Sequence, residues 1–289
     1  MAVAMIKGDN MKVIKNKRYD EERALYESDG IALEGCSFCG EADGESALKE
    51  SKNVSALECF FDLRYPFWHD TGVKIYSCEM TEKCRAALWY SKNIEIDNTK
   101  LHGVKALREC ENVSIEKCSI VSSEFGWNNK NVTISNSLVN SEYFMMNSKS
   151  LHFDNIKMEG KYSFQYVEDA VIENSELNTK DALWHAKNVL VKNCIVNGEY
   201  LGWYCENVTF ENCIITGTQP LCYCRGLRLV NCEMHLCDLA FERSEVVAEI
   251  TTPVISIKNV LKGKITVPCV DKIIKDSDNY KGVIEVNKK

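Results

Sequence analysis

The sequence predicts an all-β fold, a single-stranded right-handed parallel β-helix of about ten to twelve coils of about 19 residues each. Three observations predict it: apolar residues recur every 19 residues, polarity alternates around them, and asparagines hold two fixed places in each repeat. A unit this short cannot bury its apolar face alone, so successive units must stack on one another.

The repeat is clearest when Val113 is taken as position 1 of a unit. Position 3 is also apolar and position 2 is mostly polar, which is the alternation of a strand with one buried face. The step is 19 residues, except for 21 between Val73 and Ile94. The counterparts of Val113 are Val54, Val73, Ile94, Val132, Leu151, Ala170, Val189, Val208, Leu227 and Val246.

Asparagine and cysteine occupy fixed positions in the repeat. Asparagine recurs at positions 5 and 19, where its tolerance of left-handed backbone predicts two corners in each coil. Stacked amides at the strand spacing of ~4.8 Å are expected to hydrogen-bond along the axis. Cysteine recurs at position 6, which favours packed thiols; zinc or redox use near Cys205, Cys222, Cys224 and Cys237 is the alternative.

Composition narrows the function. The net charge is −7, with no basic block, so we expect no nucleic-acid partner. No run approaches 18 apolar residues and residues 1–10 lack a signal-peptide core, so we expect no membrane span and a cytoplasmic location with reduced thiols. No dinucleotide fingerprint, P-loop or metal-ligand spacing is present, which predicts no cofactor and no metal.

One domain is expected over residues 1–289. Residues 1–30 are assigned to an N-terminal cap, residues 31–245 to regular coils, and residues 246–289 to the C-terminal coils and their cap.

Positions 12 to 16 read as a further strand and give the candidate binding face. Position 14 is never polar and is placed inward, so positions 13 and 15 face outward. An exposed aromatic strip usually marks a binding surface, and flat indoles suit the apolar faces of sugar rings. Position 13 contributes Phe125 and Phe144, and position 15 holds all five tryptophans: Trp68, Trp89, Trp127, Trp184 and Trp203.

The opposite phase remains open. It turns positions 13 and 15 inward and makes the tryptophans a core ladder. The outward aromatic residues are then Tyr65, His69, Tyr90, Tyr166, His185, Tyr204 and Tyr223.

Charged residues beside the strip are the candidate catalytic groups. Glu124 and Glu142 lie on adjacent coils, within reach of the ~5–9 Å separation of glycosidase carboxylates. Arg108, one coil away, is placed to stabilise a carboxylate or a developing anion. Asp181 and His185 are candidate binding groups, too far apart along a strand to act as a pair. A solvated charge ladder is the simpler interpretation of position 11.

The chain also resembles known proteins. The order Asn-Val-x-Ile-x-Asn-Cys, a turn, then Ala-Leu-Trp resembles the pectin-lyase-like superfamily. YDEERALY (19–26), LRYPFWH (63–69), EFGW (124–127), KYSFQY (161–166) and GTQPLCYC (217–224) more closely resemble a bacterial right-handed β-helix family, a domain of unknown function with members labelled sugar hydrolases.

The resemblance implies a β-helix that contacts polysaccharide along the outer face of one parallel sheet. It carries over no catalytic residues, and neither an Asp cluster of the polygalacturonase type nor a lyase-type calcium site is visible on the position 12–16 strand. The first hypothesis is therefore a glycoside hydrolase with a carbohydrate ligand. The alternatives are a noncatalytic glycan-binding or scaffold protein and a polysaccharide lyase.

Overall fold

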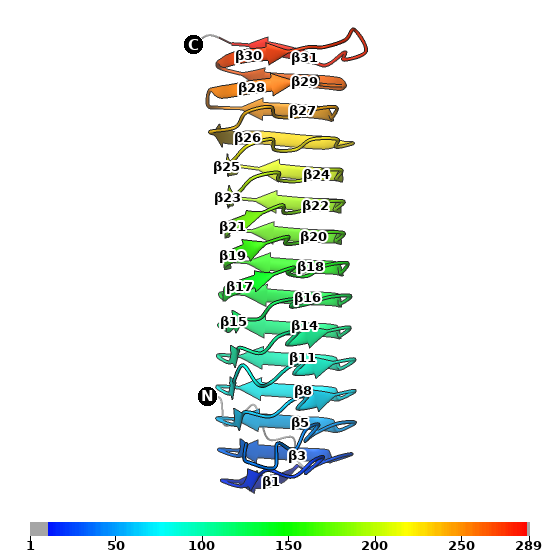
Figure 1. Ribbon diagram of the computed structural model, residues 1–289, viewed down its shortest axis with the longest axis vertical. Coiled ribbons are helices and arrows are strands. Elements are labelled where there is room, and N and C mark those ends of the chain that lie inside the picture. The colour runs from blue at the N-terminus through cyan, green and yellow to red at the C-terminus, as the bar shows by residue number, and fades with distance from the viewer. Residues whose placement is uncertain (1–10, 288–289) are drawn as a thin grey trace. The chain divides into compact units, whose positions relative to one another are not determined.

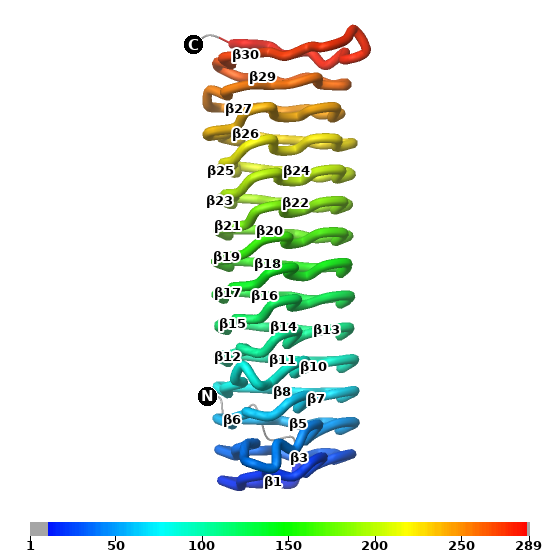
Figure 2. The backbone as a smooth tube through the Cα atoms, in the orientation of Figure 1, coloured from blue at the N-terminus to red at the C-terminus, as the bar shows by residue number. Residues whose placement is uncertain are grey.

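The computed structural model describes residues 11–287. The chain forms two compact units, residues 1–142 and 143–289, and each is a stack of coils built from parallel strands. Figure 1 shows the long strands of each unit lying one above another, and Figure 2 follows the backbone from coil to coil. This confirms the predicted parallel β-helix, although the described residues form about 14 turns where the sequence predicted about ten to twelve coils.

Unit 1 carries two parallel sheets, A and B, on different sides of its coils. Residues 12–19, which the sequence assigns to a cap, supply the first strand of each sheet. Sheet A pairs β1 (Lys12–Lys15), β3 (Asp29–Glu34), β5 (Lys52–Leu57), β8 (Thr71–Tyr76), β11 (Lys92–Asp97), β14 (Glu111–Glu116) and β16 (Lys130–Ser135). Sheet B pairs β2 (Arg18–Tyr19), β4 (Ser37–Phe38), β6 (Phe60–Phe61), β9 (Glu79–Met80), β12 (Lys100–Leu101), β15 (Ser119–Val121) and β17 (Leu138–Glu142).

Unit 2 repeats this plan and continues it to the last strand described. Its sheet A pairs β18 (Lys149–Asp154), β20 (Glu168–Glu173), β22 (Lys187–Lys192), β24 (Glu206–Glu211), β26 (Leu227–His235), β27 (Glu245–Ile250), β29 (Lys262–Val267) and β31 (Val283–Val286). Its sheet B pairs β19 (Lys157–Lys161), β21 (Glu176–Lys180), β23 (Ile195–Asn197) and β25 (Ile214–Thr216) with β26. A separate two-stranded sheet pairs β28 (Val254–Lys258) with β30 (Val270–Ile274).

The register matches the sequence interval. Ile94 pairs with Val113 and Val113 pairs with Val132. The position 1 side chains of successive coils therefore stack in a continuous inward-facing column, called a file here, in unit 1. These side chains are at most 4% exposed, and the position 3 residue Ile115 is fully buried. Equivalent positions in neighbouring coils therefore lie side by side, as the repeat predicts.

The asparagine corners are confirmed. Asn112 has a left-handed φ of 59°. Its Nδ2 donates to Oδ1 of Asn93 at 2.9 Å, and Nδ2 of Asn131 donates to Oδ1 of Asn112 at 2.8 Å. The position 5 file behaves alike, since Nδ2 of Asn231 donates to Oδ1 of Asn212 at 2.9 Å. Each amide is thus both donor and acceptor, which stabilises the corners along the axis.

All fifteen cysteines are free thiols, and thirteen of them are buried. At position 6, Sγ of Cys118 donates to the carbonyl of Glu116 at 3.1 Å, and Sγ of Cys213 donates to that of Val191 at 3.3 Å. Burial raises the pKa of the Cys118 thiol to about 11. Cys118 and Cys213 thus pack as compact thiols within the core.

The third side of the coil, positions 12 to 16, is not the strand that the sequence predicts. In unit 2, every second residue has a left-handed backbone: φ is 59° at Tyr162, 59° at Phe164 and 58° at Tyr166. The amide of Phe164 donates to the carbonyl of Phe144, whereas that of Tyr166 donates to Trp184 in the following coil. Unit 1 has only two-residue strands on this side, β7 (Phe67–Trp68), β10 (Leu88–Trp89) and β13 (Leu107–Arg108).

This backbone overturns part of the predicted binding face. Side chains alternate between two faces only where the chain is extended. Position 14 points inward as expected, but Phe125 and Phe144 at position 13 are also fully buried. The ring of Phe144 packs edge-on against Phe164 at 5.3 Å between centroids. The predicted outward placement of these two phenylalanines is therefore wrong, because both belong to the core.

Candidate functional site

The tryptophans of unit 1 are half-buried, and at least one face of each indole ring is covered. The indoles of Trp68 and Trp89 stack with centroids 5.9 Å apart and planes 17° apart. The guanidinium carbon of Arg108 lies 5.6 Å from the centroid of Trp89 and 5.0 Å from that of Trp127. Lys49 Nζ lies 4.6 Å from the centroid of Trp68. Stacked rings and cations thus occupy at least one face of each indole on which a sugar ring was expected to pack.

Unit 2 shows the same arrangement. Trp184 and Trp203 stack at 5.3 Å with planes 4° apart. Their Nε1 atoms donate to the backbone carbonyls of Tyr200 at 2.7 Å and Gln219 at 2.8 Å. Each indole therefore uses one face and its ring N–H inside the protein, which is the behaviour of a stabilising ladder.

Position 16 is the more exposed aromatic file, which the alternative phase predicted. Tyr166 is 49% exposed and Tyr204 is 44% exposed. His185 stacks between them, with centroids 4.9 Å from Tyr166 and 5.1 Å from Tyr204. Because the rings stack on one another, they offer their edges and hydroxyls to solvent and not their flat faces.

The candidate acid Glu124 lies in an ion-pair cluster. Its Oε2 is 3.2 Å from Lys105 Nζ and 3.8 Å from Arg108 Nη1, and its side chain is 29% exposed. Its amide donates to the carbonyl of Glu142 at 2.7 Å, so the two acids do lie on neighbouring coils. Two cations balance the Glu124 carboxylate, which suits a structural ion pair as well as it suits catalysis.

Asp181 and His185 have separate environments. Asp181 is 6% exposed, and burial raises the pKa of its carboxyl; Lys180 lowers that pKa and Glu199 raises it. The imidazole of His185 belongs to the aromatic stack. Neither residue is therefore an obvious ligand contact.

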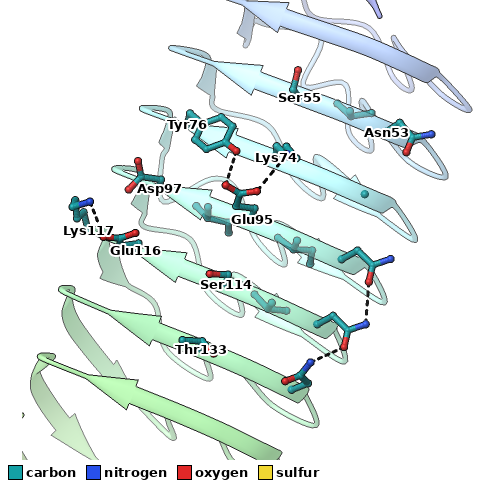
Figure 3. A pocket seen from close by; sticks show the side chains of 18 of the residues that line it. Asn53, Ser55, Lys74, Tyr76, Glu95, Asp97, Ser114, Glu116, Lys117 and Thr133 are labelled. Carbon is teal, nitrogen blue, oxygen red and sulfur yellow. Dashed lines mark hydrogen bonds and ion pairs between the residues drawn. The ribbon is translucent and has the colours of Figure 1, made fainter. Parts of the chain in front are cut away.

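A groove on the outer face of sheet A in unit 1 offers a different site. It has a volume of about 1140 Å³ and crosses β5, β8, β11, β14 and β16. Figure 3 shows polar side chains projecting from neighbouring strands, so that equivalent positions form rows across the strands. The lining includes Asn53, Ser55, Lys74, Tyr76, Asn93, Glu95, Asp97, Asn112, Ser114, Glu116, Lys117, Asn131 and Thr133.

Position 2 supplies the central row of this groove. Lys74, Glu95 and Ser114 are successive register partners on β8, β11 and β14. Glu95 accepts a hydrogen bond from the Tyr76 hydroxyl at 2.6 Å and lies 3.5 Å from Lys74 Nζ. Burial is the main cause that raises the pKa of Tyr76, and the hydrogen bond to Glu95 is the second. The Tyr76 hydroxyl therefore stays protonated and keeps donating to Glu95.

Position 4 supplies a second row, in which Tyr76 pairs with Asp97 and Asp97 pairs with Glu116. Glu116 forms an ion pair with Lys117 at 2.6 Å. Oδ1 of Asp97 is buried, and no group in residues 11–287 donates a hydrogen bond to it. An unsatisfied buried acceptor costs about 1–3 kcal/mol.

An apolar cluster lies at the end of the groove. Ala32, Leu57 and Tyr76 are at most 8% exposed although they project from the outer face of sheet A, and Met11 packs against them. Met11 also lines the groove. The start of the described chain thus helps to hold Tyr76, and through it Glu95, in place.

Sequence reasoning overlooked this groove. The sequence shows the outward polar residues of position 2, but the predicted binding face was placed at the aromatic residues of positions 13 and 15. The available signal was the run Tyr76, Asp97, Glu116 at position 4, where an outward tyrosine precedes two acids at the repeat interval. Hollowing of that face depends on packing that includes Met11, which the repeat does not encode.

Two general features of the described residues bear on function. No helix within residues 11–287 has the length and hydropathy of a membrane span. Nowhere in that range do three His, Cys, Asp or Glu side chains converge as a metal-binding group, the cysteines near residues 205–237 included.

A family model described as "Protein of unknown function (DUF3737)" matches residues 12–286. The chain belongs to this family. The match covers both units, in line with a resemblance that also spanned most of the sequence. No curated protein matches this DUF3737 chain.

Solved structures of similar shape share little sequence with this DUF3737 chain. A mannuronan C-5 epimerase A-module from Azotobacter vinelandii has 8% identity and a TM-score of 0.43, over 83% of this chain and 91% of that one. The Streptococcus pneumoniae surface adhesin PfbA has 10% identity and a TM-score of 0.41, over 98% and 87%. A catalytic domain of an alpha-1,3-glucanase in complex with nigerose has 8% identity and a TM-score of 0.39, over 83% and 63%.

Proposed function

We propose that this chain binds a carbohydrate, and that the ligand lies in the groove over β5, β8, β11, β14 and β16. The observation that carries the proposal is the continuous hollow of about 1140 Å³ lined by hydrogen-bonding side chains. Its rows repeat at the strand spacing of ~4.8 Å, so the groove offers a periodic surface to a polymer that is itself periodic.

The chemistry of the lining favours a glycan over other polymers. Asparagine, serine, threonine and tyrosine side chains alternate with paired charges, which suits a ligand rich in hydroxyl groups. Both lysines of the lining are ion-paired with glutamates, Lys74 with Glu95 and Lys117 with Glu116. A nucleic acid needs unpaired cations to neutralise its phosphates.

The predicted stacking of sugar on tryptophan is not part of this proposal. The indoles that were to bind sugar have ring faces against each other or against Arg108 and Lys49. The exposed edges of Tyr166 and Tyr204 remain an alternative contact surface in unit 2. Buried free thiols suit a reducing compartment, and we keep the cytoplasm as the proposed location.

A bulky substitution in the centre of the groove tests the binding site. Ser114 is exposed at position 2 of β14, and Arg228 is exposed at the same position of β26, outside the groove. Ser114→Trp is expected to weaken binding at least tenfold on a glycan array, because the indole fills the hollow. Arg228→Trp is the matched control and should bind as wild type. Equal binding by both variants would remove the groove from the proposal.

Hydrolysis is the second candidate function. Asp97 and Glu116 are register partners on one outer face, so their Cα atoms are ~4.8 Å apart and their carboxyls lie within reach of the ~5–9 Å separation of glycosidase acids. Glu124 and Glu142, with Arg108 beside them, are the other acid pair on neighbouring coils.

Glutamate-to-glutamine substitutions distinguish the two candidate acid pairs, because glutamine has nearly the same shape and carries no charge. If the groove hydrolyses its glycan, Glu116→Gln should lower turnover by at least a hundredfold while the glycan still binds, because an amide cannot transfer the proton. Glu124→Gln should then leave turnover within twofold. Turnover is measured by the appearance of new reducing ends. The reverse pattern would assign the chemistry to Glu124 and Glu142. Binding without product in wild type would leave a noncatalytic glycan-binding protein.

A further inference from the structure

The charges in the groove are unequal. Its lining contains three carboxylates, Glu95, Asp97 and Glu116, against the two ammonium groups of Lys74 and Lys117, a formal net charge of −1. In the ion pairs, each ammonium group is matched by a glutamate. Asp97 is the carboxylate without an ion pair of its own, although its charge also acts on Lys117 and helps to raise the pKa of that ammonium group.

Asp97 also has an unmet need for a donor. Its Oδ1 is buried without a hydrogen-bond partner among residues 11–287. Its in-register neighbours are Tyr76, whose hydroxyl donates to Glu95, and Glu116, which is itself an acceptor. Neither neighbour can satisfy Asp97 without giving up another interaction. Because Oδ1 is covered in the free protein, a ligand in the groove reaches this half-buried carboxylate at its other oxygen or after the side chain turns.

All glycans carry hydroxyl donors, but glycan classes differ in the charge that they bring to Asp97. Sugar hydroxyls donate to carboxylates, and the protonated amine of an amino sugar donates and also carries the opposite charge. A uronate or sulfate group offers no proton and brings a second negative charge close to Asp97, and like charges brought together at a binding surface lower affinity. The same groove therefore treats these classes differently.

We infer that the groove selects glycans that present hydroxyl or ammonium donors to Asp97 and discriminates against uronic-acid glycans. This inference rests on the proposed function, since it names the ligand class of the same groove. Asp97 acts here as a specificity-determining residue that accepts a hydrogen bond from the ligand.

The test is an array that carries neutral hexose oligomers, chitosan oligomers and oligogalacturonates of matched length. Wild type should bind neutral or chitosan oligomers at least tenfold more tightly than oligogalacturonates, a difference of about 1.4 kcal/mol. Stronger binding to chitosan than to neutral oligomers identifies an ammonium donor, and equal binding identifies hydroxyls.

Asp97→Asn should narrow the preference over oligogalacturonates by about tenfold, because the amide removes the charge and weakens the acceptor. Asp271→Asn, at an exposed site on β30 outside the groove, should leave the preference unchanged. Tightest binding to oligogalacturonates, or a preference that Asp97→Asn leaves intact, overturns the inference and leaves the carbohydrate proposal standing. Absence of signal from every class overturns both.

Discussion

Phe144→Ala is expected to lower the free energy of unfolding by about 3–5 kcal/mol. Phe144 is fully buried and its ring contacts Phe153 at 5.8 Å and Phe164 at 5.3 Å between centroids. Truncation removes apolar surface from the core and leaves a cavity that stacked coils, bound by hydrogen bonds on both sides, cannot easily close.

Urea denaturation followed by circular dichroism measures the change. Leu236→Ala in the same unit is the control: this leucine is 73% exposed, so its loss should shift stability by less than about 0.5 kcal/mol. A loss below about 1 kcal/mol for Phe144→Ala would restore the outward placement that period-2 alternation predicts for position 13.

Asp70→Asn is expected to stabilise the protein increasingly as pH rises from about 4 to 8. Asp70 is fully buried: its Oδ1 accepts a hydrogen bond from the Ser51 amide at 2.9 Å, and no group in residues 11–287 donates to its Oδ2. Burial raises the pKa of this carboxyl to about 8. Asn129 shows that an amide fits the equivalent position, since its Oδ1 accepts from the Cys110 amide at 2.6 Å.

The direction follows from proton linkage. The folded protein holds the Asp70 proton more tightly than the unfolded chain, in which the carboxyl has a pKa of about 3.9. The stabilising contribution of this proton is therefore complete below pH ~4 and is lost as pH rises to about 8. The loss approaches roughly 5 kcal/mol at most.

The free energy of unfolding should be measured for wild type and Asp70→Asn between pH 4 and pH 8. The wild-type value should fall relative to that of Asp70→Asn as the pH rises. The exposed Asp271→Asn should run parallel to wild type over the same range. A constant offset between wild type and Asp70→Asn across the range would show that Asp70 is ionised in the folded protein, against the burial seen here.

The sequence was sufficient to predict the coil and its register. An inward file such as Ile94, Val113, Val132 follows directly from an interval of 19, because each side chain of the file repeats the same burial. The corners followed as well, since few residues other than glycine adopt the left-handed backbone of Asn112 as readily as asparagine does.

The third side could not be predicted in the same way. Tyr162, Phe164 and Tyr166 are left-handed although none of them is a residue type that favours that conformation. Their backbone is imposed by hydrogen bonds to the neighbouring coils, so period-2 reasoning placed Phe125 and Phe144 on the wrong side. The groove could not be predicted either, because outward polar residues give the same sequence pattern on a flat sheet face and on a hollowed one.

The most direct test of the proposed site is a crystal structure of the chain soaked with the glycan that gives the strongest array signal. We predict sugar density over sheet A of unit 1, with a hydroxyl or amine of the ligand within hydrogen-bonding distance of the Asp97 carboxylate. Density that instead follows the tyrosine edges at Tyr166 and Tyr204, with the groove empty, would contradict it.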